Sequence, residues 1–291
     1  MTNVVIAGMF MAFLGVGLAM MLAFASRRLY VYENPQIGEV EDMLPHSNCG
    51  ACGTAGCRNF AERVVAGELS PAKCTVNAPA QNQLIAKVLG IELGQEEKRI
   101  ARLACAGGKH VASVKARYDG LSSCRAAAVA GGGGKACAWG CLGLADCADV
   151  CDFDAIAMNR FGLPEVNADL CTACNDCVEI CPKDLFSLQP VSNKLWVACK
   201  NNADGDIAEL QCEVACTACG RCVVDAPEGL IRLDNNLAVI DYAQNAQASH
   251  KPTERCPTGA IVWLDDVKGA LRGKAARKIV RQEALPVISE L

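Results

Sequence analysis

A chain of 291 residues can form two or more small domains. Its 20 cysteines far exceed ordinary usage and only 5% of its residues are aromatic, so no large apolar core is expected, and bound metal can stabilise small modules instead. The net charge of −4 gives no reason to expect a nucleic-acid partner.

The first predicted element is a membrane anchor, residues 1–28. The run from Val4 to Ala25 is uncharged, almost entirely apolar and long enough to cross a bilayer as one helix. A cleaved signal peptide would have a positive n-region and a short apolar core, and neither is present. Because Arg27 and Arg28 follow directly, the positive-inside rule predicts a single-pass protein of the cytoplasmic membrane with its N-terminus outside. The reducing cytoplasm disfavours disulfides and leaves the thiols free to bind iron.

Residues 29–100 are predicted to form a small iron–sulfur domain, after a linker from Tyr30 to Pro45. Its four cysteines follow a C-x2-C-x4-C-x16-C pattern and are Cys49, Cys52, Cys57 and Cys74. Glycines between them let the backbone wind tightly around a cluster, and residues 58–67 are predicted to form a short helix. Four thiolates in so compact a stretch predict one [4Fe–4S] cluster. The pattern resembles the small iron–sulfur domain of Rnf-type electron-transport complexes.

The next two segments are predicted to be connectors. Residues 78–103 have the pattern of a helical connector with charged faces. Residues 101–135 form a Cys/Gly-rich connector that contains Cys105, Cys124 and a run of four glycines, Gly131 to Gly134. That run indicates either a flexible linker or a close approach of backbone to a cluster.

Residues 136–190 are predicted to form a two-cluster ferredoxin-like module. The run CTACNDCVEICP has the C-x2-C-x2-C-x3-C-P spacing of bacterial ferredoxins, in which three thiolates bind one cubane and the fourth reaches its neighbour. One predicted ligand set is therefore Cys151, Cys171, Cys174 and Cys177. The other contains Cys141, Cys147 and Cys181. Since Leu144 occupies the position where its middle cysteine is expected, Cys137 is the nearest substitute.

Zinc is the alternative metal for these motifs, although zinc sites do not need the cysteine–proline crossover. Short apolar runs at 155–158 and 185–188 predict strands in the two halves of a pseudo-symmetric fold. The run at 163–166 is the expected mate of the first strand, and the run at 195–198 follows the second.

Residues 191–265 repeat this plan in a degenerate form. Here Cys212, Cys216, Cys219 and Cys222 align with Cys137, Cys141, Leu144 and Cys147, and the distance from Cys199 to Cys212 equals that from Cys124 to Cys137. Ala226 replaces the crossover cysteine, and residues 245–255 contain no cysteine, so the ligands of one cluster are missing together. The retained cysteines predict a single cluster bound by Cys216, Cys219, Cys222 and Cys256.

Four cysteines remain, and they are Cys105, Cys124, Cys199 and Cys212. They either build a fifth cluster between the repeats or are free buried thiols, since cysteine often behaves as a small buried hydrophobe. The spacing does not decide which site Cys137 and Cys212 serve. The chain is therefore expected to carry four to five [4Fe–4S] clusters, with no residues for acid–base or nucleophilic catalysis.

The last predicted segment, residues 266–291, is a basic tail. Its cations are Lys268, Arg272, Lys274, Arg277, Lys278 and Arg281. The spacing suits a solvated helix, and the alternative is a stretch that lies against anionic lipid or an acidic partner.

The expected fold class is α+β: a single N-terminal transmembrane helix, a small Cys-rich iron–sulfur domain and tandem bacterial-ferredoxin-like modules. The order of these parts, with the stretch LSSCRAAAVAGGGGKACAWGCLGLADC, resembles the long form of the B subunit of Rnf complexes over nearly the whole chain.

The resemblance implies a membrane-bound, ion-translocating ferredoxin:NAD oxidoreductase, in which this subunit takes electrons from soluble ferredoxin and passes them to the membrane core. It also implies that other subunits carry the flavin and nicotinamide sites. The missing cluster of the second module departs from the family pattern and puts the electron route or the docking partner in question. Two alternatives are a membrane-anchored polyferredoxin serving another oxidoreductase, such as a hydrogenase or reductase, and a structural zinc scaffold.

Overall fold

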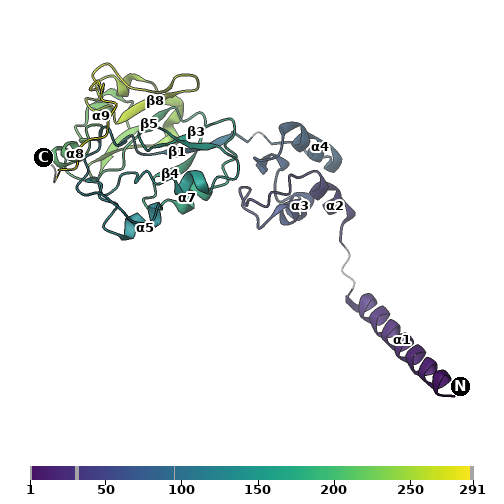
Figure 1. Ribbon diagram of the computed structural model, residues 1–291. Coiled ribbons are helices and arrows are strands. Elements are labelled where there is room, and N and C mark those ends of the chain that lie inside the picture. The colour runs from purple at the N-terminus through teal and green to yellow at the C-terminus, as the bar shows by residue number, and fades with distance from the viewer. Residues whose placement is uncertain (1, 30–32, 95, 289–291) are drawn as a thin grey trace.

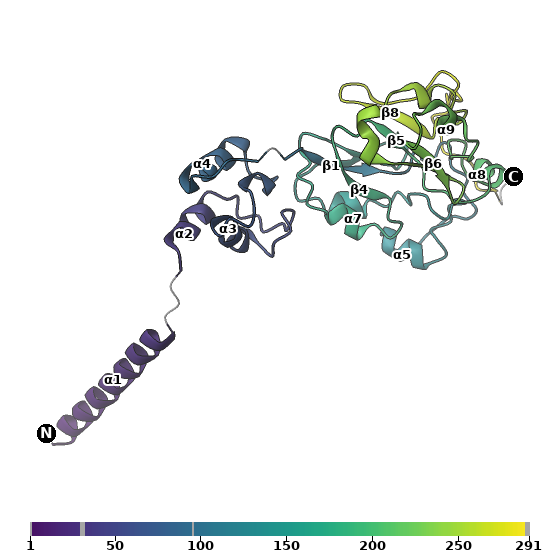
Figure 2. The same cartoon turned by 180° about the vertical axis from the view of Figure 1, so that it is seen from behind.

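The computed structural model describes residues 2–29, 33–94 and 96–288 and has the expected α+β class. The anchor helix, a small helical domain and a larger body of strands and short helices follow one another in a row (Figures 1 and 2).

The anchor is one long helix, α1 (Thr2–Leu29). Its segment Val5–Leu29 has a mean hydropathy of 2.3 and none of it is buried against the rest of the protein. It is the one helix in the described part of the chain that is long and apolar enough to cross a membrane. Arg27 and Arg28 lie in its last turn, where cations also suit the helix dipole.

The small domain packs three helices around one core. These are α2 (Pro35–Asp42), α3 (Cys57–Val65) and α4 (Pro79–Leu89), with the 3-10 turn η1 (Pro71–Lys73) between the last two. The linker predicted from Tyr30 to Pro45 is wrong for residues 35–42, because Asn34 caps α2 by accepting the backbone N–H of Gln36. Val40 of α2 is fully buried against Phe60 of α3.

The helical connector predicted up to Leu103 is also wrong at its C-terminal end. Gly90 ends α4 in the left-handed conformation with φ +67°. The chain then forms β1 (Arg99–Leu103), which pairs antiparallel with β4 (Phe186–Pro190). The pairing extends the first ferredoxin-like module upstream of residue 136. A distant strand edge thus decides the conformation of a segment whose local pattern favours a helix.

The two ferredoxin-like modules have matching strand pairs. In the first, β1 pairs with β4, which was not predicted, and β2 (Ile156–Met158) pairs with β3 (Pro164–Val166), which was. In the second, β5 (Leu195–Val197) pairs with β8 (Ile261–Asp265), and β6 (Ile231–Asp234) pairs with β7 (Leu237–Ile240). Strand β9 (Gly269–Leu271) adds to β8. Thus β1 and β5 occupy equivalent places.

Short helices connect the strands. They are α5 (Cys124–Val129), α6 (Asp146–Asp149), α7 (Asp176–Ile180), α8 (Gly205–Gln211), α9 (Arg221–Asp225), η2 (Tyr242–Gln247) and η3 (Lys251–Thr253). In the second module Tyr242 and Ala248 pack against the core beside Ala226, in the region where the missing cysteine triplet was expected. Protein side chains therefore fill that part of the module.

The four-glycine run is a packed turn. All four glycines have positive φ, and a Cβ on Gly134 would lie 1.9 Å from the carbonyl oxygen of Ala116. A side chain does not fit there, so this backbone contact requires glycine.

The basic tail is not the solvated helix that its spacing favours. After β9 it runs as an irregular strap over both modules. Arg277 donates its backbone N–H to Pro257, and Leu285 donates its backbone N–H to Lys109. Ile279 packs against the core formed by Val111 and Val214, which explains why this segment lies on the protein.

Candidate iron–sulfur sites

The twenty cysteines line five separate cavities, four cysteines to each. The five cavities are of similar size. Site A contains Cys49, Cys52, Cys57 and Cys74; site B contains Cys151, Cys171, Cys174 and Cys177. Site C contains Cys124, Cys141, Cys147 and Cys181; site D contains Cys216, Cys219, Cys222 and Cys256. The junction site contains Cys105, Cys137, Cys199 and Cys212.

The donor sets suit a multinuclear cluster, because each cavity offers four cysteine thiols. Among the described residues, no group of three or more His, Cys, Asp or Glu side chains is arranged to hold a single metal ion. A structural zinc site brings its ligands to about 2.3 Å from one ion, whereas a cubane needs four thiolates spread around a larger body. The donor sets therefore fit [4Fe–4S] clusters better than zinc.

Site A is built by a tight loop and the start of α3. Asn48 accepts the backbone N–H of Cys57 at 2.8 Å, which fixes the beginning of the helix. A Cβ on Gly56 would lie 2.8 Å from this same Asn48 oxygen, so a side chain at this position would displace the Asn48 amide that caps the helix. Asn82 of α4 donates to the carbonyl of Cys74 at 3.1 Å and so brings the fourth cysteine to the loop.

Site B brings together the four cysteines that the motif groups as one ligand set. Helix α7 carries Cys177, and the cavity is closed by apolar side chains that include Ile156, Phe153 and Leu188. The backbone N–H of Ala101 in β1 points to the Cys171 sulfur at 3.5 Å. Strand β1 thus supplies a donor of the kind that raises cluster potentials.

Site C corrects the predicted grouping of Cys137. Leu144 stands where a cysteine of this set was expected, and Cys124 of α5 supplies the fourth thiol of the cavity in its place. Cys137 lines the junction site instead. The segment between Cys105 and Cys137 is nineteen residues longer than the corresponding segment between Cys199 and Cys212. This insertion contains α5 and the glycine turn, and it folds back to deliver Cys124.

Asp146 holds this inserted ligand in place. Its carboxylate accepts the backbone N–H groups of Cys124 (2.9 Å) and Arg125 (3.2 Å) and the hydroxyl of Ser123 (3.0 Å). Burial alone acts to raise the pKa of Asp146, but these hydrogen bonds outweigh it and the pKa is lowered. The carboxylate thereby caps the N-terminus of α5.

Replacing Asp146 with alanine should selectively weaken site C. Loss of a capping side chain costs roughly 0.5–2 kcal/mol, and here it also releases the loop that carries Cys124. We expect less iron per chain and one altered EPR signal, with the other signals unchanged. Asp146→Asn keeps an oxygen acceptor, so its iron content should lie between those of the unchanged protein and Asp146→Ala. Equal iron contents in all three proteins would contradict this role.

Site D brings together the four cysteines that the sequence groups as one ligand set, and one of them is exposed. Cys219 is the one cysteine in the described chain that is exposed. It lies in the turn that precedes α9, where Ala218 and Gly220 both have positive φ. The rest of the cavity wall is apolar and includes Val197, Leu233 and Ile261. The site is therefore bounded by apolar side chains on one side and reaches the protein surface at Cys219 on the other.

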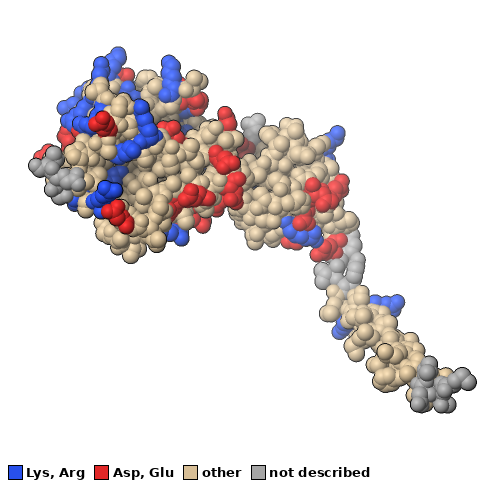
Figure 3. All heavy atoms as spheres, in the orientation of Figure 1, with Lys and Arg blue, Asp and Glu red and all other residues tan. Residues whose placement is uncertain are grey.

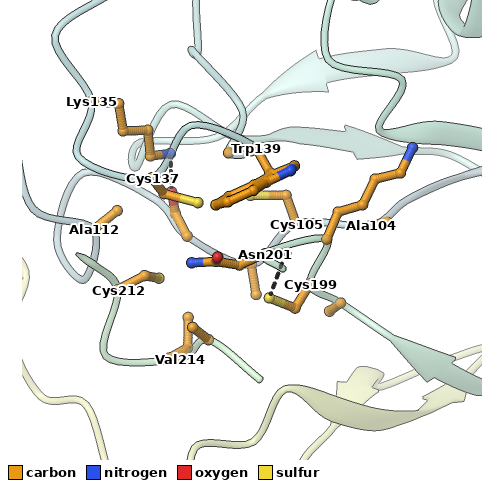
Figure 4. Close-up of a pocket in the computed structure, with 16 residues that line it drawn as sticks. Ala104, Cys105, Ala112, Lys135, Cys137, Trp139, Cys199, Asn201, Cys212 and Val214 are labelled. Atoms are coloured by element: carbon orange, nitrogen blue, oxygen red, sulfur yellow. Dashed lines mark hydrogen bonds between the residues drawn. The ribbon is translucent and has the colours of Figure 1, made fainter. Parts of the chain in front are cut away.

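The junction site draws two cysteines from each module (Figure 4). Cys105 follows β1 and Cys199 follows β5, while Cys137 and Cys212 each lie four residues before the first cysteine of their motif. The predicted alignment of Cys199 with Cys124 is therefore wrong, because the equal spacing to Cys212 and Cys137 arises by coincidence from the insertion. The structural equivalent of Cys199 is Cys105.

Burial shifts the titration of many of these thiols. It raises the pKa of Cys141, Cys147, Cys177 and Cys222 to about 12 and that of Cys174 to about 11. In the junction site it raises the pKa of Cys199 to about 12 and that of Cys212 to about 11. These thiols are neutral near pH 7 until a metal displaces their protons.

Comparison with known proteins agrees with this architecture. Residues 44–76 match the family described as "Putative Fe-S cluster" and residues 164–186 match the "4Fe-4S binding domain" family. The B subunit of the Na(+)-translocating ferredoxin:NAD(+) oxidoreductase complex of Acetobacterium woodii is 39% identical over 88% of this chain and 75% of its own length. The B subunit of the proton-translocating ferredoxin:NAD(+) oxidoreductase complex of Clostridium ljungdahlii is 37% identical over 90% and 93%. The B subunit of the ion-translocating oxidoreductase complex of Methanosarcina acetivorans is 34% identical over 86% and 95%.

Proposed function

Since this chain belongs to the family of B subunits of Rnf-type ion-translocating ferredoxin:NAD(+) oxidoreductase complexes, we propose that it accepts electrons from soluble ferredoxin at site D and delivers them at site A to the membrane subunits. The clusters supply reversible one-electron transfer when bound. The chain itself supplies the thiolates, their order and their shielding from water.

The linear order of the sites supports this proposal. Helix α6 carries Cys147 of site C and leads to Cys151 of site B, and α7 carries Cys177 of site B and leads to Cys181 of site C. The two helices contact each other, so sites B and C share walls. Between sites A and B, the hydroxyl of Thr75, which follows Cys74, donates to the carbonyl of Thr172, which follows Cys171.

The surface near site D favours an acidic soluble partner. Lysine and arginine side chains gather at the end of the larger body away from α1 (Figure 3). Arg221 and Arg232, which follow Cys219 in the sequence, have exposed side chains. Lys274 and Lys278 in the C-terminal strap are also exposed. Positive charge of this kind steers an acidic carrier and raises its association rate at low salt.

The opposite end of the series is tethered to the membrane. Five peptide steps separate Leu29 of α1 from Asn34, the cap of α2. At about 3.6 Å per residue they reach at most roughly 18 Å. Site A therefore stays near the bilayer, and we infer the orientation that the positive-inside rule predicts, with the N-terminus outside and all sites in the cytoplasm.

Replacing Cys219 and Cys222 together with alanine tests the entry point. We expect about four fewer iron atoms per chain, one cubane's content, and at least about a tenfold slower reduction of the remaining sites by reduced ferredoxin. Iron analysis and anaerobic stopped-flow spectroscopy measure these two quantities. Thr217→Ser, in the wall of the same cavity, is the matched control. An unchanged rate in the variant that lacks site D would place the entry point elsewhere.

A further inference from the structure

We propose that the junction site binds a fifth [4Fe–4S] cluster through Cys105, Cys137, Cys199 and Cys212, and that this cluster joins site C to site D. The inference rests on the proposed electron-transfer function. Without a cofactor at the junction, the series would stop at the boundary between the modules.

The symmetry of the contributions is the first argument. Cys105 and Cys199 each lie two residues after the strand that begins a module, and Cys137 and Cys212 each lie four residues before its first motif cysteine. Equivalent positions in two repeats thus converge on one cavity. Isolated buried thiols have no reason to meet in this way, whereas the ligands of a shared cofactor must.

The contacts to the neighbouring sites are the second argument. The Cys105 sulfur accepts the backbone N–H of Cys141 in site C at 3.4 Å. The Cys199 sulfur accepts the backbone N–H of Cys216 in site D at 3.3 Å. Cys141 and Cys216 are themselves equivalent residues of the two modules. The junction site therefore lies directly between sites C and D and touches each through one hydrogen bond.

The lining of the cavity is the third argument. A Cβ on Gly107 would lie 3.1 Å from the Cys212 sulfur and 3.7 Å from the Cys105 sulfur, so the backbone approaches these thiols as closely as glycine permits. The cavity is similar in size to the other four. Trp139 and Val214 line the wall (Figure 4), and an apolar wall shields a cluster from water.

The charge near the cavity also suits an anionic cluster. Lys135 lines the cavity and donates from Nζ to the carbonyl oxygens of Gly107 and Cys141, the latter at 2.6 Å. The backbone N–H of Asn201 donates to the Cys199 sulfur at 3.4 Å. One cation and the amide donors compensate part of the negative charge that four thiolates and a cluster bring into a buried site.

The first test is the iron and acid-labile sulfide content of the anaerobically purified full chain. Five cubanes give about twenty iron atoms per chain, and four give about sixteen. About sixteen would overturn the fifth cluster while leaving the proposed function intact. Near-zero iron in protein never exposed to oxygen would overturn both. This measurement needs no variant and so does not depend on how a variant folds.

The second test assigns the ligands. The double variants Cys105→Ala/Cys199→Ala and Cys137→Ala/Cys212→Ala should each lose about four iron atoms. The quadruple variant should lose no more than either, because all four cysteines serve one cluster. A loss of about eight in the quadruple variant, or no loss, would contradict the assignment. The matched control is Leu210→Ala, which removes an exposed side chain of α8 that does not line the cavity and should keep the full iron content and EPR spectrum.

Discussion

Replacing both Cys171 and Cys174 with alanine should stop ferredoxin-dependent electron flow to the membrane. These cysteines line site B, which contacts site A through the Thr75–Thr172 hydrogen bond and site C through the packing of α6 on α7. We expect the rate to fall by more than about a hundredfold, beyond the 10–100-fold typical of an outer-shell change at a metal site. Assays of ferredoxin oxidation by membranes that contain the variant complex measure this rate.

EPR of the same variant locates the break. After addition of reduced ferredoxin, the signals from sites C and D should appear, whereas the signal from site A should not. Thr172→Ser, between the two cysteines, keeps the hydrogen-bonding backbone and should behave as the unchanged protein. Normal electron flow in the double variant would falsify the proposal that these sites form one path.

Replacing Lys135 with methionine should make the clusters on both sides of it harder to reduce. The Lys135 ammonium donates to the carbonyls of Cys141 and Gly107 and lines the junction cavity. Its charge favours the thiolates of Cys137, Cys141 and Cys212, lowering their pKa values against the larger effect of burial, which raises them. A cation that stabilises a thiolate also stabilises the electron added to a bound cluster, so its removal lowers the reduction potential.

The expected shift follows from the Coulomb attraction between the Lys135 ammonium and the electron added to a cluster. At an effective dielectric constant of about 20 this attraction is roughly 1–3 kcal/mol over about 6–16 Å, which corresponds to about 40–130 mV toward more negative potential for a one-electron couple. An anaerobic redox titration followed by EPR measures it. Lys135→Arg keeps the charge and should shift the potentials little. Lys109→Met removes an exposed cation from the neighbouring loop, so a shift as large as that of Lys135→Met would indicate a general field effect.

The regular motifs were enough to predict sites A, B and D without any knowledge of the fold. In each of these sites three of the four cysteines lie within nine residues of one another, and so short a segment with fixed turns can reach only one cluster. In bacterial ferredoxins the last cysteine of one motif binds the cluster of the other motif. This rule groups Cys151 with Cys171, Cys174 and Cys177, because both motifs belong to one compact module. The same locality explains why the strand pair β2–β3 followed from its apolar runs alone.

Site C and the junction site required the tertiary structure. Cys124 reaches site C because Asp146 caps α5, a contact across more than twenty residues that no spacing rule encodes. Cys105 could be matched to Cys199 only once β1 was seen to pair with β4 as β5 pairs with β8. Sequence distance was misleading there, because an insertion in one repeat shifted the apparent alignment.

Local sequence patterns alone predicted the anchor, the small iron–sulfur domain, the tandem modules and the loss of one cluster's ligands, since each depends on composition or spacing within a short segment. Folding in three dimensions decided which four cysteines meet at the junction and the order of the sites. That order depends on long-range strand pairing and on which modules pack together, and both are set by the free energy of the whole fold rather than by any local segment.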